Sequence, residues 1–212
     1  MKKEDGLKVI LQSAKSYCSN LENQNVLFVF NNKLKETQQF EVAFFPRNFL
    51  HLTGVELAKT IGSSVDFYNL CLKNKLGIND FNIPKDGTSE MKLSILPQLV
   101  KIHKTARMIG IYNNFKANLK TEKLTGTVTA SLGFVREENY YVPNTALKED
   151  IRNVTNQPQQ IIAIFTKEIR QEKYNCLSYL QKSIKPRELK LPEYIFSKID
   201  LDNLNLDFEI KT

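Results

Sequence analysis

The spacing of apolar positions changes along this chain, and in its first segment the spacing is that of a helix. In residues 3–21 apolar side chains recur at every third or fourth position, which predicts an amphipathic helix. Residues 26–30 form an apolar run rich in strand formers, and residues 38–45 alternate polar with apolar positions. The pair Asn31-Asn32 between these segments favours a turn. We therefore predict a helix followed by a β-hairpin.

The middle of the chain returns to helical spacing. Residues 55–61 suit a short helical turn. Ser63 with Asp66 after it is typical of a helix start, and the helix should run to about Lys75 and be closed by Gly77.

A second helix of this region begins at Thr88 or Ser89 and carries apolar positions as far as Ile102. Pro97 lies inside it and should kink or interrupt it, because proline has no amide hydrogen to donate. His103 follows, where we expect either a charge at the helix C-terminus or a surface residue.

The second half of the chain is dominated by strand-like patterns. Strands are predicted at residues 108–112, 124–132, 140–143, 160–165 and 174–179, with a short helix at 146–154. This order of elements predicts an α+β fold with a central antiparallel sheet, an N-terminal helix and a helical insertion, rather than a doubly wound parallel sheet. We assign residues 1–182 to one domain, with the helical middle at about 63–104. Residues 183–212 are expected to be a tail that either wraps the periphery or is partly disordered.

The composition is that of an ordinary folded protein. Of the 212 residues, 42% are hydrophobic and 25% are charged, and there is no tryptophan. No apolar run approaches the ~20 residues that a membrane span needs, and the N-terminus does not have the apolar core of a signal peptide. These features favour a cytoplasmic protein without a membrane partner.

Metal and cofactor motifs do not occur in the sequence. The three cysteines, Cys18, Cys71 and Cys176, are far apart, so we expect buried thiols that pack as small apolar side chains. Two histidines cannot form a three-histidine site, and there is no phosphate-binding loop or nucleophile motif. We predict no metal site and no cofactor.

Basic residues gather between residues 101 and 136, where Glu122 is the only acid. The whole chain has a net charge of +7, which permits an acidic partner such as RNA or DNA. Aromatic residues lie in the same stretch, and this combination suits phosphate contact with base stacking. A solvated basic face would have the same pattern. The candidate nucleic-acid contacts, including flanking cations, are Arg47, Lys104, Arg107, Lys116, Lys120, Lys123, Arg136, Lys148 and Arg152.

His51 lies in a block that also holds Arg47 and Thr53. Cleavage of RNA without a metal needs a base for the ribose 2′-hydroxyl, an acid for the leaving oxygen and groups that stabilise the charged transition state. This block could supply them together with the polar residues of 140–145, if the fold brings the two segments together. The alternative is a buried histidine held by backbone groups in a tight turn. In the second segment, Thr145 has an alternative as a helix cap and Tyr141 as a sheet aromatic.

Several blocks, in their order along the chain, are similar to those of one family. They are residues 45–55, which contain Asn48-Phe49-Leu50-His51-Leu52-Thr53-Gly54-Val55, residues 86–93, 96–99, 121–126 through 133–134, and 140–152. Over residues 7–180 the chain resembles the fourth phage family of barnase–EndoU–colicin–RelE-like (BECR) nucleases. The order of the blocks makes this resemblance more specific than any single motif.

This resemblance implies an α+β fold with N-terminal helical material, an antiparallel sheet of about four strands and an active site on one sheet face. It also implies metal-independent RNA cleavage through a cyclic phosphate, by cargo of phages and integrative elements. By position, His51 is the candidate general acid or base and Thr53 the polar residue after it. Tyr141, Asn144 and Thr145 match the second polar block.

Two functions are therefore open from the sequence. The first is a ribonuclease-like, toxin-like effector of a phage or mobile element that acts on RNA and is opposed by an immunity or antitoxin protein. The second is a non-catalytic accessory or inhibitor protein on a nuclease-like fold, which binds RNA, DNA or a nucleoprotein through the same basic residues.

Overall fold

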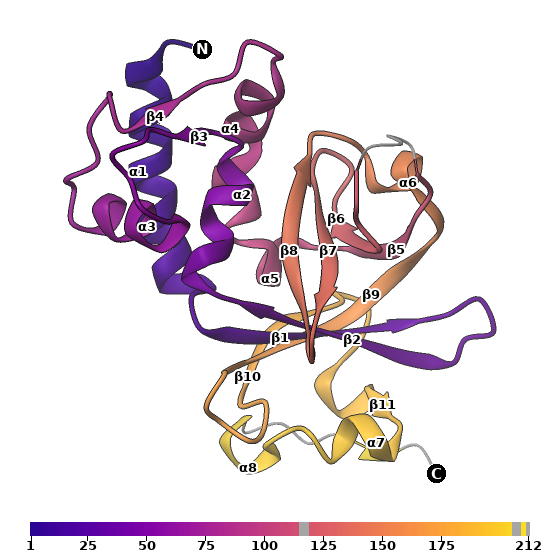
Figure 1. Ribbon diagram of the computed structural model, residues 1–212. Helices are drawn as coiled ribbons and strands as arrows, with labels where there is room; N and C mark the ends of the chain where they lie inside the picture. The colour runs from indigo at the N-terminus through magenta and orange to yellow at the C-terminus, as the bar shows by residue number, and fades with distance from the viewer. Residues whose placement is uncertain (115–118, 205–208, 211–212) are drawn as a thin grey trace.

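The computed structural model describes residues 1–114, 119–204 and 209–210, and its largest element is an eight-stranded sheet (Figure 1). The strands pair in the order β1-β2-β8-β7-β6-β5-β9-β10, and β1 also pairs with β9, so the pairing closes on itself. The strands are β1 (Gln24–Asn31), β2 (Thr37–Phe44), β5 (Met108–Tyr112), β6 (Lys123–Gly126), β7 (Ser131–Glu137), β8 (Tyr140–Leu147), β9 (Thr155–Glu168) and β10 (Cys176–Leu180).

The long strand β9 closes the ring because its two halves pair with different strands of the ring, and it also pairs with β10. Residues 155–160 pair with β5, and residues 161–168 pair with β1. Among the described strands of this sheet, every pairing is antiparallel except that of β2 with β8, where Val42 lies opposite Tyr141. The α+β class with a mostly antiparallel central sheet is confirmed, although the sheet is larger than the resemblance implied.

Four helices form a layer beside one end of the sheet (Figure 1). They are α1 (Lys3–Asn20), α2 (Phe49–Thr53), α3 (Ser64–Leu72) and α4 (Thr88–Leu99). The shorter elements between β2 and β9 are η1 (Pro46–Asn48), β3 (Glu56–Leu57), β4 (Phe81–Asn82), α5 (Ile102–Thr105) and α6 (Ile151–Val154). None of the helices that the structure describes has the length and apolar character needed to cross a membrane.

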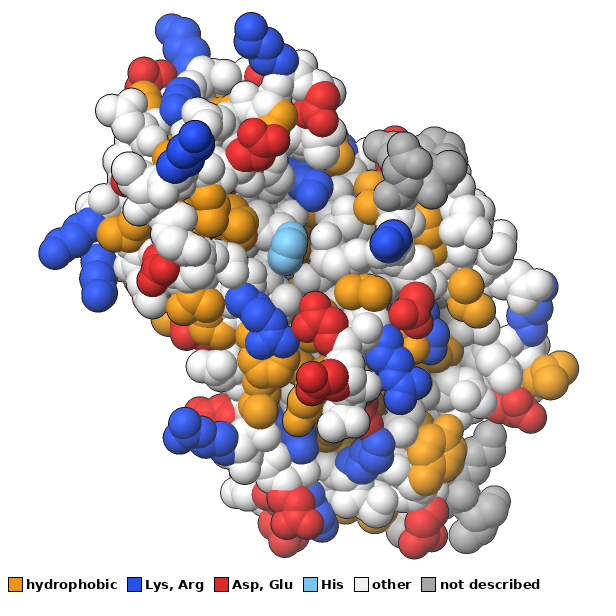
Figure 2. All heavy atoms as spheres, in the orientation of Figure 1, with side chains coloured by type: hydrophobic (Ala, Val, Ile, Leu, Met, Phe, Trp, Pro, Cys, Tyr) orange, Lys and Arg blue, Asp and Glu red, His pale blue; other side chains and the backbone are white. Residues whose placement is uncertain are grey.

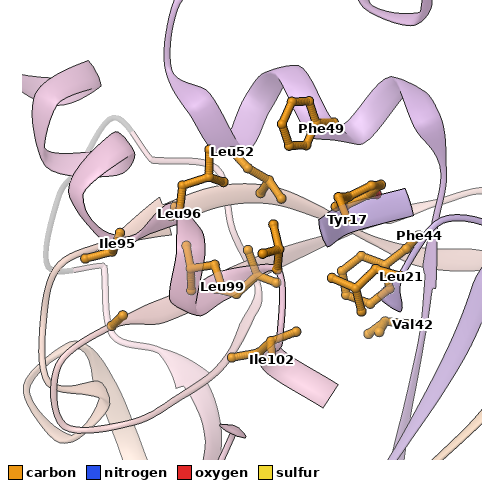
Figure 3. Packing of buried hydrophobic residues seen from close by; sticks show 14 of the residues in the cluster. Tyr17, Leu21, Val42, Phe44, Phe49, Leu52, Ile95, Leu96, Leu99 and Ile102 are labelled. Atoms are coloured by element: carbon orange, nitrogen blue, oxygen red, sulfur yellow. The ribbon is translucent and has the colours of Figure 1, made fainter. Parts of the chain in front are cut away.

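An aromatic core joins this helical layer to the sheet. Figure 3 shows Tyr17, Phe44 and Phe49 pointing into the same space, together with Leu52 of α2. The ring centroids of Tyr17 and Phe49 are 5.4 Å apart, and the Tyr17 hydroxyl donates to the carbonyl of Phe45 at 2.9 Å. The buried hydroxyl is thus satisfied. This packing fixes the segment 45–53, which carries His51, against the end of β2.

The opposite face of β1 is covered by the C-terminal part of the chain. Successive side chains of a strand point to opposite faces, and here Leu27 and Val29 pack with Leu191 and Ile195 in a separate apolar cluster. The C-terminal elements are η2 (Pro186–Glu188), β11 (Lys190–Leu191), α7 (Glu193–Phe196), α8 (Leu201–Leu204) and β12 (Glu209–Ile210), which pairs with β11.

Elements predicted from short-range patterns are confirmed. They include α1, the hairpin of β1 and β2, and the strands β5, β9 and β10. The hydroxyl of Ser63 accepts the amide hydrogen of Asp66 at 3.1 Å, as expected of a helix cap. The helix α4 ends at Leu99, shortly after Pro97, and a new helix begins at Ile102.

Two predicted helical features are wrong. Residues 55–61 are not helical, because the helix lies earlier, in α2, and Gly54 with a φ of 70° turns the chain out of it into β3. The helix α3 ends at Leu72 and not at about Lys75, and Gly77 does not close it, because Asn74 takes a left-handed conformation with a φ of 52°.

Long-range pairing overturns two further predictions. Ala146 and Leu147 continue β8 and pair with β7, so the helix of this region is only α6, which Asp150 caps. Thr145 is therefore a strand residue and not a helix cap. The predicted strand at 124–132 divides into β6 and β7, because the amide of Thr127 donates to the carbonyl of Ala130 at 2.9 Å and closes a turn.

The burial of three side chains differs from expectation. His103 is not at the surface, because α5 packs on β9 and β10 and leaves this residue 4% exposed. Cys71 is buried as predicted, but Cys18 and Cys176 are exposed free thiols. Cys18 lies on the outer side of α1, and Cys176 begins the edge strand β10.

Candidate functional site

The turn that presents His51 is built from local hydrogen bonds and a buried helix face. The side chain of Asn48 accepts the amide hydrogen of Phe45 at 3.0 Å and so begins the turn. Phe49 and Leu52 of α2 are fully buried, whereas the side chain of His51 on the other side of this helix is exposed. The alternative of a histidine enclosed by its apolar neighbours is therefore wrong. Figure 2 shows a histidine side chain at the surface where the helical layer meets the sheet; of the two histidines, His51 is exposed and His103 is buried.

The charges around His51 favour a neutral imidazole at neutral pH. Partial burial of the ring lowers the pKa of His51 below its usual value; the ammonium group of Lys92 adds to the decrease, and the carboxylate of Glu137 opposes it. Lys92 Nζ also donates to the backbone carbonyl of His51 at 3.0 Å. A neutral imidazole at the surface can accept a proton from a bound substrate.

A groove of about 560 Å³ lies at the tip of the β7–β8 hairpin, near the start of α2. Arg47 and Glu137 line it and form an ion pair at 3.0 Å, and Tyr140 forms part of its wall. The guanidinium carbon of Arg47 lies 4.4 Å from the ring centroid of Phe45, which holds the cation close to the groove. The groove thus combines a cation, a carboxylate and an aromatic side chain; His51 does not line it, but the Glu137 carboxylate of the groove acts on the pKa of His51.

Three polar residues that the sequence predicts for the site are buried or form hydrogen bonds within the fold. The Thr53 hydroxyl donates to the carbonyl of Leu50 at 2.7 Å and accepts the amide hydrogen of Val55 at 3.2 Å. Thr145 is 3% exposed within β8. Asn144 donates to the carbonyl of Lys120 and accepts from the Thr121 hydroxyl, so it ties β8 to the loop before β6.

Tyr141, by contrast, faces a pocket of about 350 Å³ on the sheet. Its hydroxyl donates to Glu122 at 3.1 Å, and burial together with this carboxylate raises the pKa of Tyr141. Lys123 lies beside it, with Nζ 5.6 Å from the Tyr141 ring centroid and 4.7 Å from that of Phe40. Arg136 and Tyr140 also line the pocket, so Tyr140 separates it from the groove near His51.

The candidate cations do not form one stripe. Arg107 donates to the carbonyls of Lys104 and Ala106, and Arg152 forms an ion pair with Asp150. Lys120 and Lys148 are exposed, Lys104 borders a different depression beside His103, and Lys116 lies outside the described residues. On the face seen in Figure 2, basic and acidic side chains are intermixed. Of the predicted contacts, Arg47, Lys123 and Arg136 line the groove or the pocket.

The sequence prediction missed Lys92, Glu122 and Glu137. The sequence signal for Glu122 is that it is the only acid among the basic residues 101–136, and in the structure its carboxylate accepts a hydrogen bond from Tyr141. Lys92 and Glu137 had no such signal, because only the folded chain brings them to His51. Within the described ranges, no group of three or more His, Cys, Asp or Glu side chains is arranged to hold a metal ion.

A family model matches residues 9–183, which include every residue of the groove and the pocket. The chain belongs to the phage-Barnase-EndoU-ColicinE5/D-RelE like nuclease 4 family. No curated protein and no solved structure matches the chain. The family confirms the resemblance found in the sequence and gives a nuclease-type function. The matched segment ends at residue 183, so the C-terminal elements from η2 onward lie outside it.

Proposed function

We propose that this member of the nuclease family cleaves RNA by metal-independent acid–base chemistry, with His51 as a proton-transfer group. The observation that supports this most strongly is the exposed imidazole of His51, with a lowered pKa, between Lys92 and Glu137. A base of this kind must be both accessible and unprotonated near neutral pH. On this proposal the closed sheet is a larger variant of the BECR fold, and the protein is an effector of a phage or mobile element.

The reaction proceeds within one RNA strand. His51 takes the proton of a ribose 2′-hydroxyl, the 2′-oxygen attacks the adjacent phosphorus, and the bond from phosphorus to the 5′-oxygen breaks. The products are a 2′,3′-cyclic phosphate and a 5′-hydroxyl, whose proton comes from a general acid. Tyr141 is the candidate acid, because its phenol carries a proton at neutral pH and it belongs to the second polar block. Arg47 in the groove supplies positive charge for the phosphorane-like transition state.

The direct test is cleavage of a 5′-labelled single-stranded RNA in excess EDTA. We expect products that end in a 2′,3′-cyclic phosphate. A matched strand with one deoxyribose at the mapped cleavage position should resist cleavage at that bond only, because the attacking oxygen is missing there. Cleavage that requires added Mg²⁺, or that proceeds at the deoxyribose, would contradict the proposal.

A second candidate function is supported by the occupied polar groups. The side chains of Thr53 and Asn144 form hydrogen bonds within the fold, and Thr145 is buried. Fewer polar side chains therefore face a substrate than the sequence predicted. A non-catalytic protein that binds RNA, DNA or a nucleoprotein would need basic side chains at its surface but no polar catalytic groups. It predicts salt-sensitive binding without a cleaved product, and full function of His51→Ala. An immunity or antitoxin partner and a cytoplasmic location stay predictions from the sequence.

A further inference from the structure

Lys123 occupies an unusual position, because it forms a wall of two depressions at once. Its side chain is half-buried and lines both the pocket of about 350 Å³ beside Tyr141 and a second depression of about 310 Å³ between β5 and β9. Within the part of the chain that the structure describes, its Nζ has aromatic rings as neighbours but no hydrogen bond and no ion pair. Burial also lowers the pKa of Lys123. The carboxylate of Glu122 opposes this decrease, although it forms no ion pair with Lys123.

The first depression is suited to a polar aromatic ligand. Tyr140 and Tyr141 line it, together with Asn25 and Gln39. The side-chain oxygens Oδ1 of Asn25 and Oε1 of Gln39 are buried, and among the described residues neither has a hydrogen-bond partner. Both oxygens are enclosed by the protein, so the groups that the depression offers to a ligand are the rings of Tyr140 and Tyr141 and the cation of Arg136. The ring of Tyr140, whose residue is 44% exposed, offers a stacking surface.

The second depression has apolar walls and an amide rim. Phe30, Ile109 and Ile111 line it, and Asn156 and Gln159 supply amide groups. The pairing of β5 with β9 is irregular at this site, where the register shifts between Ile109 and Ile111. A flat base can pack on such apolar walls while the amides bind its edge.

A third depression continues the series on the other side. Tyr140 is shared by the first depression and by the groove that holds Arg47 and Glu137. The three sites are therefore linked in a row, with Lys123 between two of them and Tyr140 between the next two. We propose that a single-stranded nucleic acid lies along this row, with a backbone phosphate at Lys123 and one nucleotide in each depression. This inference rests on the proposed function for the class of ligand.

The charges along the row are compatible with a phosphate backbone. Of the acids that line it, Glu41 forms an ion pair with Lys198, and Glu137 forms one with Arg47. Glu138 at the hairpin tip is exposed. Lys123 and Arg136 are thus the cations of the row without an ion pair among the described residues, and Lys123 is the one that lines two depressions. Because Lys123 and Tyr140 each stand between neighbouring depressions, separated bases fit the row better than stacked base pairs do.

The test is binding of a fluorescein-labelled oligonucleotide with 2′-O-methyl riboses, which lacks the attacking hydroxyl and cannot be cleaved by the proposed route. Anisotropy should show affinity that rises from one to about three nucleotides and rises less beyond that length. Lys123→Gln should weaken binding about tenfold and reduce the slope of log K against log salt by about 0.7, the value for one phosphate contact to a single strand. Tyr140→Ala should weaken binding about tenfold through lost stacking. A duplex of the same sequence should bind more weakly than the single strand.

Lys59→Gln is the matched control, because this exposed lysine of the helical layer lines none of the three depressions. It should bind as the wild type does, and melting curves verify that all variants are folded. Unchanged binding by both Lys123→Gln and Tyr140→Ala would overturn the inference, as would equal loss in Lys59→Gln. His51 lines none of the three depressions, so His51→Ala is assayed for RNA cleavage and not as a binding control. If the variant cleaves RNA normally, the His51 proposal fails while the binding row stands.

Discussion

The two histidines of this chain lie in short helices, α2 and α5, and in both cases burial lowers the pKa of the imidazole. Their surroundings nevertheless differ. His103 is 4% exposed, and its Nδ1 has no hydrogen-bond partner among the described residues. His51 is exposed and lies between charged groups from α4 and β7. A lowered pKa alone therefore does not mark a reactive group, whereas access and charged neighbours distinguish α2 as the candidate site.

The largest expected contrast is in cleavage. His51→Ala should reduce the rate of RNA cleavage about a hundredfold, because a positioned acid or base contributes on this order. Its free energy of unfolding should change by less than about 0.5 kcal/mol, since the side chain is exposed. His103→Ala should have the opposite profile, with loss of stability and little change in rate per folded molecule. Single-turnover assays and urea unfolding on both variants check this, and an equal loss of rate in the two would remove the distinction.

The second contrast is in stability against pH. Burial, with a contribution from Lys104, lowers the pKa of His103 to about 4 in the folded protein. Below pH 6.5 the unfolded chain takes up a proton that the folded protein does not, so the free energy of unfolding should fall as the pH decreases and level off near pH 4. Between pH 7.5 and pH 5 the expected loss is about 2 kcal/mol. His103→Gln should remove this part of the pH dependence, and an identical profile in the variant would show that His103 does not cause it.

A smaller effect concerns the charges beside His51. Lys92→Met removes the ammonium group that lowers the pKa of His51, so the acid limb of the cleavage profile should move to higher pH. Rates measured from about pH 4.5 to 8 report this midpoint. Movement to lower pH would contradict the assignment of this limb to His51.

The smallest effect should come from the opposing carboxylate. Glu137→Gln removes a charge that raises the pKa of His51, so the same limb should move to lower pH. The change also breaks the ion pair with Arg47, whose partners are both about half exposed, so the stability cost should be below about 1 kcal/mol. Opposite shifts in Lys92→Met and Glu137→Gln, measured side by side, would sharpen the assignment, whereas equal shifts would point to an indirect effect.

Much of the fold could be predicted from the sequence wherever a local pattern decides the structure. The hairpin of β1 and β2 follows from alternation and a short turn, and the start of α3 follows from Ser63 and Asp66. Ala146 and Leu147 were mispredicted as helical because their pairing with β7 is a contact between distant segments that local propensity does not contain. The burial of His103 likewise depends on β9 and β10, which come much later in the chain.

The candidate site was predictable in part for the same reason. His51 and the block around Tyr141 were identified as blocks of a resembling family, and the structure packs α2 against β8. The proposed partners, Lys92 and Glu137 for His51 and Glu122 for Tyr141, come from other segments. Thr53 and Thr145 were predicted as site residues, but the fold uses them: the Thr53 hydroxyl binds a backbone carbonyl and Thr145 is buried in a strand.

The most direct test of the account is the pH dependence of RNA cleavage in EDTA, compared with the titration of His51 followed by NMR in the same buffer. We expect the rate to fall on the acid side with a midpoint below 6.5, equal to the pKa that NMR gives for His51. A rate that is independent of pH across the titration of His51, or a midpoint that persists in His51→Ala, would contradict the role of His51 in proton transfer.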